Sequence, residues 1–398
     1  MKKTFTSIIL LMLCGGWLFA ADIDMQIHWG TKEAQFKSMS TAGNQMKYYT
    51  GDFTPENLRA LYGDELFGAL NTLMGNTCKL DQVGYDYNAL RYAYVNVDKD
   101  LNTSGNIIGY YDGQSMNGAW DQGKTYNREH TWPQSQGANK STPMGYDMQS
   151  VRPSSSAINS DRGNTPYGEG SNYYDPDVIA INNPLYEASH LGSYRGDCAR
   201  VILYDYTVYG EAGGHKNDFY LGNAQLLDKL GKNGVFESIT ILLKWHMMDP
   251  SSLTEMVRND GAQTYQGNRN PFIDYPELAI QMLQDQVTSY KVNVTGAEMW
   301  PAYSLTLSHG FIAYMGTKTS RPEEVTVTGA TSTYDKDSGK LTITDVKGAV
   351  SISVASPQAL EETQDGKKAI KTIHNGQIVI IKNGKAYTVL GAPVGDIR

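Results

Sequence analysis

The chain has 398 residues, enough for one large domain and a smaller one, and its 40% hydrophobic and 19% charged residues exclude a disordered protein. A formal net charge of -8 argues against a protein that coats nucleic acid by long-range attraction, although it allows a locally basic groove. This charge argues against a nucleic-acid binding module more than against an enzyme that acts on nucleic acid, because an enzyme that must release its product can tolerate weak general affinity.

The first 21 residues have the pattern of a secretory signal peptide. A basic start at Lys2 and Lys3 is followed by an apolar run from Ile8 and by small residues at positions 20–21. The apolar run is too short for a membrane span, and no later segment approaches the roughly 20 apolar residues that a span needs. We therefore expect a soluble mature protein that is secreted, either periplasmic or extracellular.

Two cysteines, Cys78 and Cys198, remain after removal of the signal peptide. In an oxidising compartment they can form one disulfide. Cys198 lies in an apolar run, where a buried free thiol is the alternative. The sequence leaves both interpretations open.

Helical patterns dominate the first two thirds of the chain. Thr54 can cap a helix whose first position is Pro55, and apolar residues then recur at helical spacing to about residue 75. Asp249 before Pro250 predicts another helix start by the same rule. Further helices are predicted over residues 85–93, 194–204 and 237–245, and a strand over residues 107–111. The polar run 258–274, rich in Arg and carboxamides, either satisfies buried backbone groups or contacts phosphates, and the structural role is the more frequent one.

The side chains best suited to catalysis gather around His130 and Asn164. An imidazole ordinarily titrates near neutral pH, so His130 can deprotonate a water as a general base. Glu129 and an asparagine carbonyl, Asn164 first and Asn159 second, offer the oxygen ligands that Mg²⁺ prefers. Because neighbouring residues of a strand point to opposite faces, Glu129 and His130 share a site only at a strand end or a bulge. On residue types alone, a structural histidine is the more common interpretation of His130.

The spacing between these residues predicts two strands and a short helix. Residues 147–151 can form the return strand, and residues 157–163 a helix that ends at a glycine. This order brings the helix end back against the first strand, as a ββα unit around one metal ion. Arg152 or Arg162 would then hold the scissile phosphate as a bidentate clamp.

Four motifs occur in one order along roughly residues 54–278. They are NREHTWPQS at 127–135, Arg152-Pro153, NSDRGNTPYG at 159–168, and a run over 245–274 that ends in QGNRNPFID. Together they resemble the bacterial endonuclease I family of secreted nucleases, members of the His-Me finger group. One departure is that the family often has a histidine in the return strand, where this chain reads DMQSV at 147–151.

The resemblance implies a ββα-metal nuclease of low sequence specificity that acts on DNA and often RNA and leaves 5′-phosphate ends. Carried over by position, His130 is the general base, Glu129 and Asn164 bind the divalent ion, and an arginine supports the phosphate. Mg²⁺ is the expected cofactor, with Mn²⁺ or Ca²⁺ as alternatives.

The composition changes near Arg321, where short alternating stretches begin to predict β-strands. Asn-Gly pairs at 375–376 and 383–384 fit hairpin turns between three short strands. We therefore predict a signal peptide (1–21), an endonuclease I-like catalytic domain (22–320) and a small β domain (321–398). The last resembles C-terminal sorting segments of exported proteins, and substrate or surface binding is the alternative.

These observations predict an α+β protein, with a ββα-metal (His-Me finger) core embedded in a largely helical domain and a small C-terminal all-β domain. The predicted function is that of a secreted, sequence-nonspecific endonuclease that hydrolyses DNA, and RNA as a second substrate, by a one-metal mechanism. The alternative is a secreted binding or adhesive protein with a nuclease-like scaffold. We expect a monomer.

Overall fold

The computed structural model describes residues 47–78, 86–100, 102–171, 173–177, 193–210, 220–222, 235–316 and 321–354, and the strands between residues 370 and 396. The predicted signal peptide, residues 1–21, lies outside these ranges. Two compact units divide the chain, Met1–Val354 and Ala355–Arg398. The described part of the chain contains both helices and β-sheets, so the chain is an α+β protein, as predicted.

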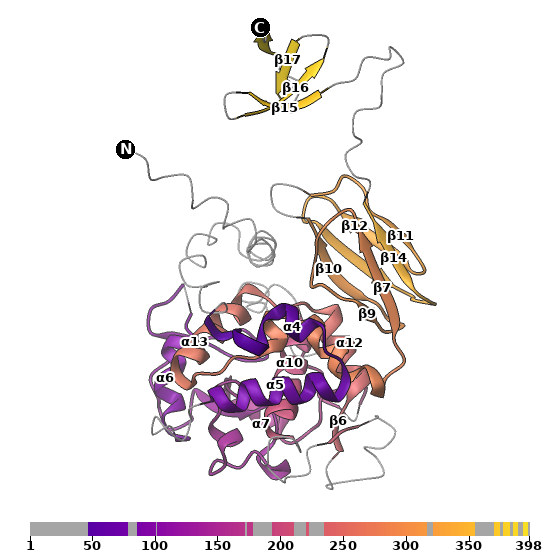
Figure 1. Ribbon diagram of the computed structural model, residues 1–398. Coiled ribbons are helices and arrows are strands. Elements are labelled where there is room, and N and C mark those ends of the chain that lie inside the picture. The colour runs from indigo at the N-terminus through magenta and orange to yellow at the C-terminus, as the bar shows by residue number, and fades with distance from the viewer. Residues whose placement is uncertain are drawn as a thin grey trace. The chain divides into compact units, whose positions relative to one another are not determined.

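Helices are the main regular structure of the described part of the larger unit up to residue 286 (Figure 1). The α-helices are α4 (Pro55–Arg59), α5 (Gly63–Thr77), α6 (Leu90–Val97), α7 (Ser156–Arg162), α10 (Arg195–Tyr209), α12 (Ile239–Met248), α13 (Leu253–Gln266), α14 (Pro271–Asp274) and α15 (Glu277–Leu283). Single 3-10 turns are η2 (Gly51–Phe53), η3 (Gln134–Gln136), η4 (Pro143–Tyr146) and η6 (Gln284–Gln286).

The helix predicted over residues 54–75 is two helices, α4 and α5. Thr54 caps α4 as predicted, because its Oγ1 accepts a hydrogen bond from the Asn57 N–H at 3.3 Å. The chain then turns and α5 begins at Gly63, whose φ of +53° is in the region that favours glycine. A Cβ at Gly63 would lie 2.4 Å from the carboxylate of Asp285. Close packing against η6 therefore determines where α5 begins.

The other helix predictions have mixed outcomes. The helix start predicted at Asp249 is wrong, because α13 begins at Leu253 with a capping box formed by Ser252 and Glu255. Asp249 instead follows the end of α12, and its carboxylate accepts a hydrogen bond from the Gly196 N–H at 2.9 Å. The helices predicted over residues 85–93, 194–204 and 237–245 correspond to α6, α10 and α12.

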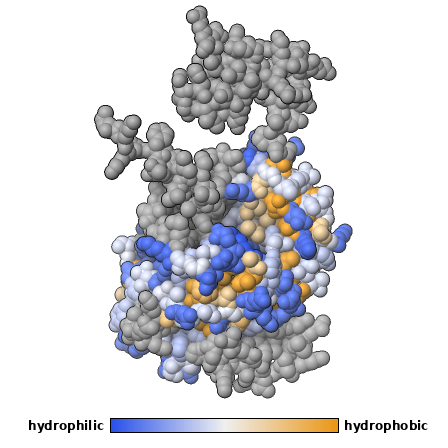
Figure 2. Space-filling model, viewed as in Figure 1, coloured by the Kyte–Doolittle hydropathy of each residue, from blue (hydrophilic) through white to orange (hydrophobic). Residues whose placement is uncertain are grey.

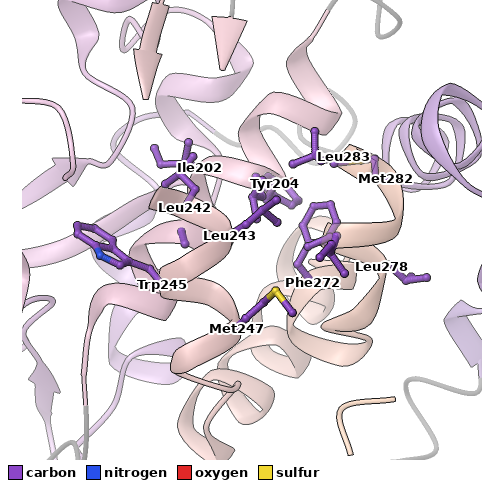
Figure 3. Packing of buried hydrophobic residues seen from close by; sticks show 14 of the residues in the cluster. Ile202, Tyr204, Leu242, Leu243, Trp245, Met247, Phe272, Leu278, Met282 and Leu283 are labelled. Carbon is purple, nitrogen blue, oxygen red and sulfur yellow. The ribbon is translucent and has the colours of Figure 1, made fainter. Parts of the chain in front are cut away.

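The hydrophobic core of the larger unit surrounds α10, which is buried along most of its length and packs against α12 and α5. Figure 3 shows Ile202 and Tyr204 of α10 beside Leu243 of α12, with Phe272 of α14 and Leu278 of α15 completing the cluster. Each such buried side chain contributes about 1.5–3 kcal/mol relative to an exposed one. Both cysteines are free thiols, with Cys198 buried in this core, so the structure supports the free-thiol interpretation over a disulfide.

In the described part of the chain, three two-stranded sheets lie among the helices. Two are antiparallel, β1 (Asn106–Ile108) with β2 (Ser115–Asn117), and β3 (Tyr126–His130) with β4 (Val151–Ser155). The third is parallel, β5 (Tyr220–Gly222) with β6 (Val235–Ser238). The return strand was predicted at residues 147–151 but begins at Val151, because the Ser150 and Val151 N–H groups both bond the Asp147 carbonyl in a turn.

Two four-stranded sheets complete the larger unit, in the strand orders β12-β13-β10-β8 and β11-β14-β7-β9. Their strands are β7 (Tyr290–Thr295), β8 (Met299–Trp300), β9 (Leu305–Thr306), β10 (Phe311–Met315), β11 (Thr326–Thr328), β12 (Thr331–Asp335), β13 (Lys340–Thr344) and β14 (Val350–Ser353). Each sheet combines strands from both sides of residue 320. The structure thus differs from the boundary predicted at 320/321, because Phe311 and Leu341 share one hydrophobic core with Leu283 and the unit extends to Val354.

The smaller unit contains one antiparallel four-stranded sheet. Its strands, in spatial order, are β15 (Ile370–His374), β16 (Gln377–Lys382), β17 (Lys385–Thr388) and β18 (Pro393–Asp396). The first three occupy the positions predicted for short strands. The two Asn-Gly pairs between them lie outside the described residues.

The coloured surface in Figure 2 is largely hydrophilic or neutral, and its hydrophobic residues gather in smaller groups. Among the described residues, the large hydrophobic side chains with the most exposure are Tyr62 at 38% and Tyr92 at 65%. No helix in the described part of the chain is long and apolar enough to cross a membrane.

A buried polar network occupies the run predicted to be either structural or phosphate-binding. Arg269 has no exposed surface, and its guanidinium bonds Asp274 at 2.7 and 2.8 Å and Asp260 at 2.5 Å. Gln266 and Asn268 in the same run are also fully buried and hydrogen-bonded to each other. The run is therefore structural, which was the more frequent of the two predicted roles.

We expect Arg269→Ala to lower the free energy of unfolding by about 3–5 kcal/mol, because it leaves Asp274 and Asp260 buried without their cation. Urea unfolding followed by tryptophan fluorescence measures the change. Arg195→Ala is the matched control: it breaks a pair with Asp175 in which the arginine side chain is 34% exposed, so its effect should stay below about 1 kcal/mol. Equal effects of the two substitutions would contradict the structural role of Arg269.

Candidate active site

The two stretches singled out in the sequence meet at β3, β4 and α7. Across the strands, Glu129 pairs with Arg152 and His130 with Val151 in a continuous antiparallel register. The chain passes directly from β4 into α7, where the Ser155 Oγ caps the helix. Helix α7 ends before a glycine with positive φ, as the sequence predicted. Two antiparallel strands followed by a helix therefore hold the candidate residues.

His130 is a buried residue at the end of β3, with 6% of its surface exposed. Its Nε2 lies 3.2 Å from the carbonyl oxygen of Gly145, and its Nδ1 lies 3.3 Å from the amide nitrogen of Gln134. A carbonyl oxygen can only accept a hydrogen bond, so in the neutral imidazole Nε2 carries the proton and Nδ1 keeps a lone pair. This arrangement leaves Nδ1 as the nitrogen that can accept a proton.

The protonation of His130 is set mainly by burial. Burial lowers the pKa of His130 to about 4, and the positive charges of Arg128 and Arg162 act in the same direction. The imidazole is therefore neutral at physiological pH, which is the state that a general base requires.

The carbonyl group that contacts His130 belongs to the tight turn η4. A Cβ added to Gly145 would lie 1.9 Å from the carbonyl oxygen of Asn139, so this backbone approach accepts only glycine. The Gly145 N–H also donates to the carbonyl of Thr142 at 2.9 Å. The orientation of His130 thus depends on a turn that a side chain at Gly145 would displace.

Glu129 lies on the opposite face of β3 from His130, because neighbouring residues of a regular strand alternate. It is 2% exposed, and its Oε1 accepts hydrogen bonds from the Tyr111 hydroxyl at 2.7 Å and from Arg162 Nη1 at 3.1 Å. Burial raises the pKa of Glu129, whereas Arg162 and Tyr111 favour the ionised form. The carboxylate is thus a buried group with a cationic partner.

Arg162, at the end of α7, connects the helix to the end of β3. Its Nη1 also donates to the carbonyl of His130 at 2.9 Å, and its Nη2 to the carbonyl of Thr131 at 2.8 Å. The guanidinium is 4.7 Å from the ring centre of Tyr167, and the residue is 1% exposed. Its described contacts are therefore internal to the protein.

Arg152, the other arginine predicted to bind phosphate, is also buried. Its Nε lies 3.7 Å from Asp98 Oδ1, and its guanidinium lies 4.5 Å from the ring centre of Tyr110. The structure therefore places both predicted arginines near the site but engages each with internal partners.

The two candidate asparagines differ in position. Asn159 precedes Arg162 by three residues in α7, so the two share a helix face, which is the face toward β3. Asn159 is half-buried, whereas Asn164 follows Gly163 beyond the helix end and is exposed. Of the two amides, that of Asn159 is the one on the Glu129 side of the helix.

The donor set is compatible with a hard divalent ion. Among the described residues, no group of three or more His, Cys, Asp or Glu side chains is arranged to hold a metal. Glu129 and the amide oxygen of Asn159 or Asn164 together supply two oxygen ligands, and Mg²⁺ commonly keeps water in its remaining positions. These residues therefore fit Mg²⁺ better than a soft metal.

Sequence reasoning missed Arg128 and Tyr87. Arg128 lies two residues before His130 and so shares its face of β3. Its guanidinium lies 3.5 Å from the ring centre of Tyr87, which in turn stacks on His130 at 5.5 Å. The alternation of the predicted strand pointed to Arg128. Tyr87 is distant in sequence, and no local pattern linked it to His130.

We expect the imidazole of His130 to titrate near pH 4 in an NMR experiment, well below the ordinary value near 6.5. The folded-state pKa is depressed, so the folded protein binds fewer protons than the unfolded chain between these values, and stability should fall as the pH drops from about 6.5 through about 4. His130→Gln should reduce that pH dependence. A titration midpoint above 6 would contradict a buried, neutral imidazole.

We expect Gly145→Ala to displace the η4 backbone, to lower the free energy of unfolding by about 1–3 kcal/mol and to shift the NMR signals of His130. The control is Gly75→Ala in α5, where an added Cβ meets nothing within 4 Å. That substitution should be neutral or stabilising by up to about 1 kcal/mol. Unchanged His130 signals in Gly145→Ala would show that the turn does not orient the imidazole.

Comparison with known proteins gives the family of the chain. The Endonuclease I family model matches residues 69–277. An extracellular ribonuclease of Bacillus subtilis (strain 168) is 28% identical over 300 residues, which cover 70% of this chain and 97% of the relative. An extracellular ribonuclease of Bacillus amyloliquefaciens is 30% identical over 231 residues, which cover 54% of this chain and 73% of the relative.

These matches support an enzyme and not the alternative of a binding protein with a nuclease-like scaffold. The matched region contains β3, β4 and α7 with every candidate residue named above. Since the family model covers just over half of the 398 residues, the chain belongs to the endonuclease I family and is a nuclease.

Proposed function

We propose that this nuclease is a secreted, sequence-nonspecific endonuclease that hydrolyses phosphodiester bonds of DNA and RNA with His130 as the general base. One observation carries the proposal: the contact between His130 Nε2 and the Gly145 carbonyl directs the imidazole lone pair to Nδ1. Burial keeps that imidazole neutral. A neutral, oriented imidazole is what deprotonation of a water requires.

The order of two strands and a helix supports a ββα-metal site of the His-Me finger kind. We assign Glu129 and Asn159 as ion ligands, with Asn164 as the alternative, because Asn159 shares a helix face with Arg162, which contacts Glu129. Mg²⁺ is the ion that these donors favour. When bound, it supplies positive charge against the charge that grows on the phosphate and the departing oxygen.

The residues of the chain then have distinct roles. His130 Nδ1 accepts a proton from a water, whose oxygen forms the new bond to phosphorus while the bond to the 3′ oxygen breaks. The departing 3′ oxygen takes a proton from solvent water, so the products are a 5′-phosphate and a 3′-hydroxyl. The exposed side chain of Gln134 lies 3.3 Å from Nδ1, in the position where this water must bind. The water therefore has to displace the Gln134 amide.

The arginine that supports the phosphate needs a guanidinium on the His130 face. Arg152 and Arg162 were predicted for this role, but their internal contacts favour a positioning role. Arg128 shares the face of His130 and is half-buried, and although its Nη1 donates to the Tyr87 carbonyl at 2.6 Å, it forms no ion pair with a described residue. We therefore assign the phosphate contact to Arg128.

The nucleophile determines the range of substrates. Attack by water does not use the 2′-hydroxyl of RNA, so the same site can cleave both DNA and RNA. Both relatives are named as extracellular ribonucleases, which supports RNA as a substrate and secretion as the destination. The monomeric state and the sorting or accessory role of residues 321–398 stay predictions.

We expect His130→Ala to lose cleavage by about 10²- to 10⁴-fold while binding Mn²⁺ or Mg²⁺ as the parent does, because it removes the base and leaves the ion ligands. Plasmid DNA and a single-stranded RNA, each with Mg²⁺ or EDTA, report the activity. Cleavage by His130→Ala at near the parent rate would refute the assigned base. Products that end in 2′,3′-cyclic phosphates instead of 5′-phosphates would show attack by the 2′-hydroxyl and refute the assigned nucleophile.

The ion ligands are tested by a matched pair of asparagine variants. We expect Asn159→Ala to weaken Mn²⁺ affinity about 10-fold or more, as the loss of a ligand or its support does elsewhere, and Asn164→Ala to leave it within about twofold. Isothermal titration calorimetry measures both. The reverse order of effects would transfer the role to Asn164, and no effect from either would refute the amide ligand.

A further inference from the structure

One group of side chains beside His130 extends beyond the proposed chemistry, in which only its member Arg128 has a role. It consists of Tyr87, Arg128, Trp120, Arg91 and Tyr92, and we refer to it as the aromatic–arginine row. Its members come from the turn before α6, from α6 itself, from the loop after β2 and from β3. Rings and guanidinium groups alternate along the row.

The distances in the row are those of stacked contacts. Starting beside His130, the guanidinium of Arg128 lies 3.5 Å from the ring centre of Tyr87 and 4.8 Å from that of Trp120. The guanidinium of Arg91 lies 5.8 Å from the ring centre of Trp120 and 5.0 Å from that of Tyr92. The row is thus continuous from the imidazole to Tyr92.

The charge of the row is not balanced by neighbouring carboxylates. Neither Arg91 nor Arg128 forms an ion pair with a described residue, and the Nε of each has no hydrogen-bond partner among those residues. Arg200 and Arg269, by contrast, bond carboxylates at 2.5–2.8 Å. In a chain with a net charge of -8, two cations without an ion-pair partner among the described residues, of which Arg128 lies next to the candidate base, form a local site for an anion.

The exposure of the row increases away from His130. His130 is 6% exposed, Tyr87, Arg128, Trp120 and Arg91 are half-buried, and Tyr92 is 65% exposed. Tyr92 is the most exposed large hydrophobic side chain among the described residues, although it lies within α6. Burial in a core does not explain its ring.

We propose that the aromatic–arginine row is a binding subsite for an unpaired stretch of the nucleic-acid substrate, in which bases stack on the rings and guanidinium planes and the two arginines neutralise phosphates. Single strands are bound in this way elsewhere because every base has an aromatic face, and the contact tolerates any sequence. Paired bases stack on each other and do not offer these faces. The subsite therefore favours single-stranded RNA or DNA over duplexes, and the inference rests on the nuclease function proposed above.

The test uses Tyr92→Ala and Arg91→Ala, neither of which has a part in the assigned chemistry. Binding of a fluorescein-labelled 12-nucleotide single strand to the full chain, in EDTA to prevent cleavage, is followed by fluorescence anisotropy. We expect each substitution to weaken binding about 5- to 30-fold. Tyr62→Ala, at the other exposed tyrosine, and Tyr92→Phe, which keeps the ring, should stay within about twofold.

Further measurements show whether weaker binding comes from lost stacking, from lost charge or from unfolding of the variant. Tyr92→Ala should change the affinity for a 12-base-pair duplex by less than about twofold, and Arg91→Ala should reduce the slope of log affinity against log salt concentration by about 1. Thermal unfolding checks that each variant is folded, as the exposure of Tyr92 leads us to expect. Single-strand affinity unchanged by both substitutions, or equal weakening for single strand and duplex by Tyr92→Ala, would overturn the subsite.

The subsite and the nuclease function can fail separately. Cleavage by the parent, combined with parent-like binding by both variants, would refute the subsite and leave the function intact. Weakened binding by both variants, combined with no cleavage by the parent under any divalent ion, would support the subsite and refute the proposed reaction. In the cleavage assay, the subsite requires a raised KM for single strands with an unchanged kcat.

Discussion

The buried guanidinium of Arg162 is the contact on which the site depends. It joins the end of α7 to the Glu129 carboxylate and to the carbonyls of His130 and Thr131, at 2.8–3.1 Å. Hydrogen bonds to a charged group contribute roughly 1.5–3 kcal/mol each, and removal of one partner from a buried pair costs more than the pair itself contributes. The placement of α7 against β3 is therefore coupled to the ionised state of Glu129.

A second constraint acts on the other side of His130. The Asp147 carboxylate accepts hydrogen bonds from Tyr204 and Tyr209 of α10 and from Gln266 of α13, at 2.6–2.7 Å. Asp147 begins the turn that leads into β4 and directly follows η4, which carries the Gly145 carbonyl. The imidazole is thus held between a turn anchored on α10 and α13 and a strand end anchored by α7. Residues far from the chemistry in sequence determine its orientation.

Local chemistry made part of this structure predictable. The cap at Thr54 and the helix end at Gly163 follow from side-chain hydrogen bonding and backbone freedom within a few residues, and the structure has both. The break before Gly63 and the late start of β4 at Val151 depend on tertiary contacts, namely Asp285 for the first and the turn at Asp147 for the second. No local pattern contains such contacts.

The same distinction applies to the site. Motif order along the chain led to Glu129 and His130, and strand alternation, applied consistently, would have led to Arg128. Two arginines, Arg152 and Arg162, were predicted to reach the phosphate because a sequence shows charge but not burial. In the structure both are buried among aromatic rings and internal acceptors. Burial determines whether a guanidinium can contact the substrate or only other groups of the protein.

The two faces of β3 explain how an acidic protein can act on a polyanion. On one face, the buried Glu129 carboxylate has Arg162 as a cationic partner at 3.1 Å. On the other, Arg128 lies beside His130 without a carboxylate partner among the described residues. The net charge of -8 weakens long-range attraction to nucleic acid, so affinity must come from short-range contacts at this face. Because long-range attraction is weak, only these short-range contacts hold a cleaved strand. This favours release of the product over its retention.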